Sequence, residues 1–254
     1  MDIDLNADLG EGFGPWRMGD DEALLGIVSS ANVACGFHAG DPVIMDRTVR
    51  TAHLNGVDVG AHVGFPDLLG FGRRPMQVEP AELVSYVRYQ LAALAGMART
   101  AGHRMTHMSF HGALGNVAAA DETIAGPLVR AVAEFDPALT ISTSSSRAIE
   151  DAAERHGLRV RRTFLADRAC DEHGLLIPRK LPKSVIHQPE EVLARVQQLL
   201  EDGTVTTYDG KRIRMRAHSI LLHGDTPGAV ALARAVRQLV ETQGAVVPIS
   251  RQAD

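Results

Sequence analysis

The chain has 254 residues, a net charge of −5 and 45% hydrophobic residues, so its length suits one large domain or two small ones. Two cysteines cannot build a disulfide scaffold, and no apolar run approaches the ~18 residues of a membrane span. The acidic balance argues against nonspecific nucleic-acid binding, which depends on clustered lysine and arginine. The first residues are acidic and strand-like, unlike a signal peptide. We therefore expect a cytoplasmic protein that acts on small molecules, without nucleic-acid or membrane partners.

Short apolar runs alternate with amphipathic stretches along the whole chain. The predicted strands are Ile3–Leu5, Ser30–Ala34, Val57–Ala61, Met105–Phe110, Leu139–Ser142, Val160–Leu165 and Ser219–Leu222. The predicted helices are Ala23–Val28, Pro42–Asn55, Pro80–Ala101, Asp121–Glu134, Ser146–His156, Pro189–Asp202 and Pro227–Thr242. A hairpin is expected around Asp209-Gly210-Lys211.

These seven β/α steps, with no linker or repeat between them, predict a single α/β domain over residues 1–254. A seven-stranded (β/α) barrel fits better than an open doubly wound sheet, which stays the alternative. The run Gly10-Glu11-Gly12-Phe13-Gly14 has the wrong spacing for a dinucleotide-binding loop. The long loop after the third strand is typical of functional segments.

Polar residues follow most of the predicted strands. They are Asn6 and Asp8 after the first strand, His38 after the second, His62 after the third, His111 after the fourth, Asp167 after the sixth, and His223 with Asp225 after the seventh. In a β/α barrel these positions meet at the C-terminal rim, where active sites are built. Four of the eleven histidines thereby converge, and the other seven are predicted to be structural or on the surface.

Neutral histidines and carboxylates at such a rim can move protons near pH 7 or bind a divalent metal. Both uses suit the addition of water to an amide or lactam carbonyl. A zinc site would need three protein ligands, which Asp8, His38 and either His62 or His111 could supply. Cys35 lies in an apolar run, so an inert buried thiol is the favoured interpretation.

The same segments resemble a known family. Asp4–Gly14 is similar to the opening motif of the LamB/YcsF family. The similarity continues through Ser29–Pro42, Gly60-Ala61-His62, Phe65-Pro66-Asp67, Gly70–Arg74, His111–Leu114, Ala166-Asp167-Arg168 and His223–Pro227. The motifs occur in the expected order and span nearly the whole chain.

The resemblance implies a seven-stranded barrel like those of glycoside hydrolases and deacetylases, and a role in ATP-dependent opening of 5-oxo-L-proline to L-glutamate. It implies two partner subunits, B and C, with ATP as a co-substrate of the assembly; the chain has no phosphate loop of its own. The catalytic residues expected on this basis are Asp8, Glu11, His38, His62, His111 and Asp167. The expected substrate-binding residues are Asn6, Arg73, Arg74, Asn116, Arg168, His223 and Asp225.

Five positions depart from the usual family pattern. A lysine is replaced by Ser109, two tyrosines by Gly115 and Cys170, a glutamate by Thr163 and a proline by Val63. The paired loss of a cation and a carboxylate points to 5-oxoproline or a related lactam as substrate. Two other functions stay open: a metal-dependent deacetylase or amidohydrolase that works without ATP, and a noncatalytic binding subunit. A homo-oligomer is also compatible with the sequence.

Overall fold

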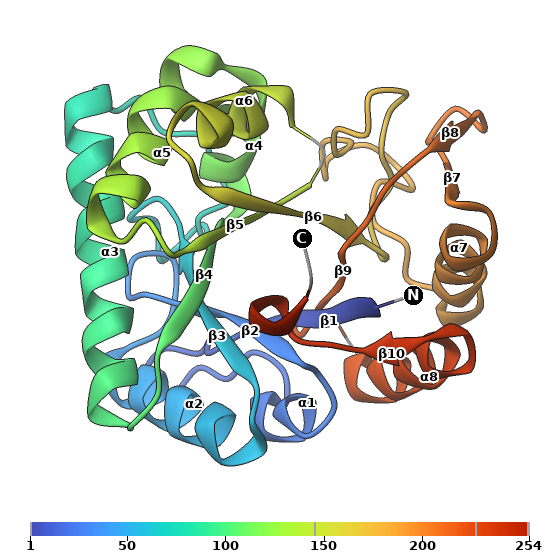
Figure 1. The fold of residues 1–254 in the computed structure, drawn as a ribbon, viewed down its shortest axis with the longest axis horizontal. Helices are drawn as coiled ribbons and strands as arrows, with labels where there is room; N and C mark the ends of the chain where they lie inside the picture. Colours follow the sequence, from blue (N-terminus) through green and yellow to red (C-terminus); the bar gives the residue numbers. More distant parts are fainter. Residues whose placement is uncertain (1, 145, 227, 253–254) are drawn as a thin grey trace.

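The computed structural model describes residues 2–144, 146–226 and 228–252. Its main strands are β1 (Asp2–Leu9), β2 (Ser30–Ala34), β3 (Asp58–Val63), β4 (Met105–Phe110), β5 (Thr140–Thr143), β6 (Arg159–Leu165) and β9 (Ser219–His223). These seven strands pair in parallel in that order, and β9 pairs back with β1 to close a barrel (Figure 1). The predicted seven-stranded β/α barrel is confirmed, and the open sheet is wrong.

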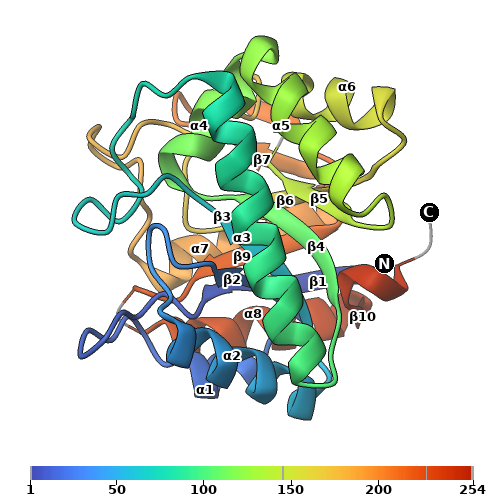
Figure 2. The same ribbon diagram turned by 90° about the vertical axis from the view of Figure 1, so that its left-hand side faces the viewer.

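Helices surround the barrel, and α3 runs along its outer face (Figure 2). They are α1 (Asp21–Leu25), α2 (Pro42–Asn55), α3 (Pro80–Thr100), α4 (Gly112–Ala120), α5 (Glu122–Phe135), α6 (Arg147–Arg155), α7 (Pro189–Asp202) and α8 (Ala229–Gln243). The predicted ends of α2 are confirmed, because Asp41 caps its first amides and Gly56 ends it in the left-handed conformation. None of the described helices is both long and apolar enough to cross a membrane.

Smaller elements complete the fold. The predicted hairpin is present as β7 (Thr204–Thr206) and β8 (Arg212–Arg214). The two-residue β10 (Ala245–Val246) pairs with the start of β1, and the 3₁₀ turn η1 (Ile249–Arg251) follows it. The predicted helix Pro227–Thr242 begins at a residue outside the described ones, and so does part of the segment between β5 and α6, at position 145.

Three site residues lie inside strands instead of after them. Asp8 belongs to β1, His62 to β3 and His223 is the last residue of β9, so the predicted strand ends were too early. The reason is that alternate residues of a barrel strand point inward, and here the inward positions are polar. On β1, Asp4, Asn6 and Asp8 alternate with Leu5, Ala7 and Leu9, which belong to the hydrophobic core.

Buried hydroxyl groups satisfy the lower end of the barrel. The carboxylate of Asp4 accepts hydrogen bonds from Ser29, Ser30 and Ser219 at 2.6–2.7 Å. The C-terminal turn closes this end, because Ser250 donates from its amide and its hydroxyl to Asp58. The opposite end, where the strands finish, is left for the site.

Candidate active site

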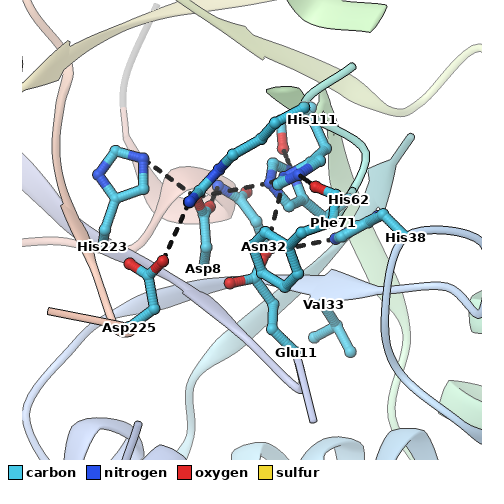
Figure 3. A network of polar contacts seen from close by, with 12 residues as sticks. Asp8, Glu11, Asn32, Val33, His38, His62, Phe71, His111, His223 and Asp225 are labelled. Atoms are coloured by element: carbon cyan, nitrogen blue, oxygen red, sulfur yellow. Dashed lines mark hydrogen bonds and ion pairs between the residues drawn. The ribbon is translucent and has the colours of Figure 1, made fainter. Parts of the chain in front are cut away.

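Acids and histidines from several strands gather at the carboxyl end of the barrel (Figure 3). Asp8, His62 and His223 come from β1, β3 and β9. Glu11, His38, His111 and Asp225 stand in the connections that follow β1, β2, β4 and β9. The innermost five, which are Asp8, Glu11, His38, His62 and His111, are each at most 5% exposed. The structure therefore brings together most of the residues that the sequence placed at the rim.

Glu11, His38, His62 and His111 form a compact cluster. Glu11 Oε1 lies 3.3 Å from His38 Nε2 and 3.6 Å from His111 Nδ1, and His111 Nδ1 lies 2.9 Å from His62 Nε2. The rings of His38 and His111 stack with centroids 3.8 Å apart. One ligand atom from each residue falls within 4.8 Å of the others. Three imidazoles and a carboxylate suit a zinc-type ion, although the sequence suggested Asp8 as the carboxylate where the structure has Glu11.

The hydrogen bonds assign the protons in this cluster. The carbonyl of Phe71 can only accept, so His111 carries its proton on Nε2, 2.8 Å away. Its Nδ1 then accepts from His62 Nε2, which leaves His62 Nδ1 to accept from the hydroxyl of Ser109 at 2.7 Å. Burial lowers the pKa of both His38 and His111 well below the usual range, so both rings are neutral near pH 7.

The loop after β3 covers the cluster. Besides its carbonyl contact, the Phe71 ring meets His38 and His111 edge-on at 5.7 and 5.3 Å. Gly72 has a φ of +62°, and a Cβ there would lie 2.8 Å from atoms of both histidines. Arg74 pairs with Asp67 of the same loop, with its own side chain 65% exposed. Arg74 thus stabilises the loop and does not face the cluster.

Asp8 connects the cluster to a second group of ionisable residues. Its Oδ2 lies 3.5 Å from His62 Nε2 and 3.9 Å from His223 Nε2, and its Oδ1 accepts from Asn32 at 2.9 Å. Burial alone would raise the pKa of Asp8, but the two histidines and Asn32 hold it well below its usual range. Burial and the charge of Asp8 raise the pKa of Glu11. One carboxylate is therefore ionised, whereas its neighbour favours the protonated form.

The second group is built on β9 and the connections around it. His223 Nδ1 donates to Asp167 at 2.8 Å, and Arg179 donates to His223 Nε2 at 3.1 Å. Burial tends to lower the pKa of His223, but the charge of Asp167 and its hydrogen bond raise it overall. Arg73 pairs with Asp225 at 3.0 Å and remains partly exposed. Two guanidinium groups thus stand beside the acid–histidine cluster.

Three other predicted substrate-binding residues lie apart from these contacts. Arg168 donates to the backbone carbonyls of Ser184 and Ile177, so it holds the loop after β6 together. Asn116 is exposed on α4. Asn6 is fully buried inside the barrel, and within the described part of the chain neither atom of its amide has a hydrogen-bond partner.

Sequence reasoning missed Arg179 and Asn32. Arg179 lies between β6 and α7 in a stretch without helix or strand, so no periodicity could place it. Asn32 lies inside a strand that reads as apolar, and only its position two residues before the end of β2 could have suggested an inward side chain.

The sequence model of the LamB/YcsF family matches residues 3–253. The chain belongs to the LamB/YcsF family. A LamB/YcsF protein of Pseudomonas syringae pv. tomato, named as 5-oxoprolinase A subunit 1, is 66% identical over 99% of this chain and 98% of its own length. The 5-oxoprolinase A subunit 2 of Ralstonia nicotianae is 64% identical over 99% of this chain and 97% of its own.

A solved structure gives the same result for the fold. The lactam utilization protein of Thermus thermophilus superposes with a TM-score of 0.90 at 41% identity, covering 98% of this chain and 99% of that one. The LamB/YcsF barrel is therefore shared along the full length.

Proposed function

We propose that this LamB/YcsF chain is the A subunit of an ATP-dependent 5-oxoprolinase and that its barrel opens 5-oxo-L-proline to L-glutamate. The observation that carries the proposal is the full-length 66% identity to a protein named as a 5-oxoprolinase A subunit. The buried acid–histidine rim supports it, because such groups suit proton transfer in amide hydrolysis. We also propose that the chain works in the cytoplasm as one barrel domain.

The reaction needs a base, an acid and an anion site. A water oxygen bonds to the ring carbonyl carbon, the bond from that carbon to the ring nitrogen breaks, and the nitrogen takes up a proton. Resonance makes the lactam unreactive, so ATP would be used to activate it. We assign ATP use to partner subunits B and C, since the sequence of this chain contains no phosphate loop.

The geometry suggests a role for each group. Asp8, held ionised, accepts the proton of the attacking water. His223, charged with the help of Asp167, donates a proton to the departing ring nitrogen. Arg73 and Arg179 bind the carboxylate of the substrate; Arg179 then leaves His223 Nε2 free to carry that proton. The base and the acid are close together, with Asp8 Oδ2 and His223 Nε2 3.9 Å apart.

A second candidate, favoured by the Glu11-His38-His62-His111 cluster, is a metal-dependent amidohydrolase or deacetylase that works without ATP. The donor set fits a divalent ion, and the raised pKa of Glu11 would fall when a cation binds beside it. A bound ion would polarise the carbonyl and acidify a water molecule. Elemental analysis of the purified chain, with hydrolysis measured in the absence of ATP, tests this candidate directly.

The decisive experiment mixes the chain with its cognate B and C subunits and follows glutamate release from 5-oxoproline. The first proposal expects release that depends on ATP and on all three subunits, and the second expects ATP-independent turnover that a chelator removes. His38→Ala and His111→Ala should each abolish release, whereas His103→Gln, a histidine change on the outer surface, should not. Full activity of both alanine variants in an intact complex would instead indicate a noncatalytic subunit.

A further inference from the structure

Four inward positions form a continuous row across neighbouring strands. Asp8 of β1 pairs with Asn32 of β2, Asn32 with Gly60 of β3, and Gly60 with His107 of β4. Asn32 and His107 are fully buried. Figure 3 shows the amide of Asn32 beside the Asp8 carboxylate. The row therefore runs from the candidate base to a histidine outside the cluster already described.

Two features of the backbone place His107 in this row. The pairing of β3 and β4 shifts by one residue between Val59 and Gly60, so Thr106 is an extra residue and His107 turns inward. Gly60 then leaves room for the ring, because a Cβ on Gly60 would overlap the His107 imidazole. Both a strand glycine and a fully buried histidine reduce stability unless something compensates.

The hydrogen bonds of the row can be arranged in one way only. A carboxylate can only accept, so Asn32 directs Nδ2 at Asp8 Oδ1 (2.9 Å) and Oδ1 at His107 Nε2 (3.1 Å). His107 must then carry its proton on Nε2, and its Nδ1 accepts from the hydroxyl of Thr106 at 2.9 Å. Burial lowers the pKa of His107 to about 4, in agreement with a neutral ring.

We propose that Asn32 and His107 are positioning residues for Asp8. Together they hold Oδ1 of the carboxylate, so that Oδ2 faces His62 and His223 at 3.5 and 3.9 Å. Without them the carboxylate could rotate about its side chain, and the reacting oxygen would be misplaced. This inference rests on the proposed function, in which Asp8 accepts the proton of water.

The test uses the assembled enzyme with the B and C subunits and measures glutamate release. His107→Phe keeps the ring volume but removes the donor, and Asn32→Leu keeps the shape of the amide. Each should lower kcat by about 10- to 100-fold, as expected for a misplaced catalytic group, with KM changed by less than about twofold. His107→Gln restores an N–H donor and should recover most of kcat, and His103→Gln is the matched control. Should His107→Phe fail to fold, Asn32→Leu and His107→Gln carry the same comparison.

Double variants separate positioning from general damage to the core. Asn32→Leu combined with His107→Phe should lower kcat no further than the larger single change, because both break the same chain of hydrogen bonds. In an Asp8→Asn enzyme, His107→Phe should have no further effect. Wild-type kcat in His107→Phe, or multiplying effects in the double variant, would overturn the positioning proposal while Asp8→Asn remains inactive. Full activity of Asp8→Asn would refute the role of Asp8 in the proposed function, and the positioning role with it.

Discussion

Gly72 is the position where a single methyl group should separate folding from activity. It lies in the loop over the histidine cluster with a φ of +62°, which L side chains rarely adopt. The Cβ of an alanine would come within 2.8 Å of His38 Cβ and of His111 Cδ2. Gly72→Ala therefore combines backbone strain with a direct push on two rings of the site.

The two effects can be estimated separately because the chain offers a matched control. Gly203 ends α7 with the same φ of +62°, and a Cβ there would meet nothing within 4 Å. Gly203→Ala should therefore cost only the backbone strain, about 1–2 kcal/mol. Gly72→Ala adds the crowding of a packed interior, about 1–3 kcal/mol more. The expected loss in the free energy of unfolding is about 2–5 kcal/mol for Gly72→Ala.

Urea unfolding of the two variants measures the free energy, and glutamate release by the assembled enzyme measures activity. We expect Gly203→Ala to keep the wild-type kcat, and Gly72→Ala to lose at least about tenfold even where it is fully folded, since small displacements of catalytic groups are costly. Equal stability and equal activity of the two alanine variants would refute the close packing of this loop on His38 and His111.

Three further changes test other parts of the structure. Asp167→Asn should move the alkaline limb of the kcat/KM pH profile to lower pH, because the charge of Asp167 opposes the effect of burial and raises the pKa of His223; an unmoved limb would exclude His223 as the acid. Arg179→Ala should raise KM for 5-oxoproline by about tenfold or more, as for a lost charged hydrogen bond, whereas Arg88→Ala on the outer surface should not. Burial raises the pKa of Asp4 from 3.8 to about 6, so the free energy of unfolding should fall as pH rises through that window. Asp4→Asn should flatten that dependence in urea titrations; an unchanged slope would contradict it.

Where local signals were strong, the sequence predicted the elements well. The helix α2 was found at both ends because Asp41 and Pro42 start it and Gly56 stops it. The helix α4 was missed because Gly112 and Gly115 weaken its propensity and no side chain caps its first turn. It packs against α5 and α6, and such tertiary contacts are not visible in a local pattern.

The site followed the same division. Strand order alone indicated that Asp8, His38, His62 and His111 would converge, since parallel strands finish at one end of a barrel. Which atoms meet could not be predicted, because it depends on ring orientation and on how the loop after β3 folds back. The cluster therefore includes Glu11, which the sequence presented only as a loop acid in a family motif.

The division of labour between the two faces of the barrel explains how so many ionisable groups can be buried together. The outward residues of β1 belong to the hydrophobic core, whereas the inward residues hydrogen-bond across the ring. Stability thus comes mainly from the layer between strands and helices, where apolar area is removed from water. The inside is then free to hold Asp4 with its three serines at one end and Asp8 with Asn32 at the other. An inward substitution that keeps these hydrogen bonds should consequently change the rate of reaction far more than the free energy of unfolding.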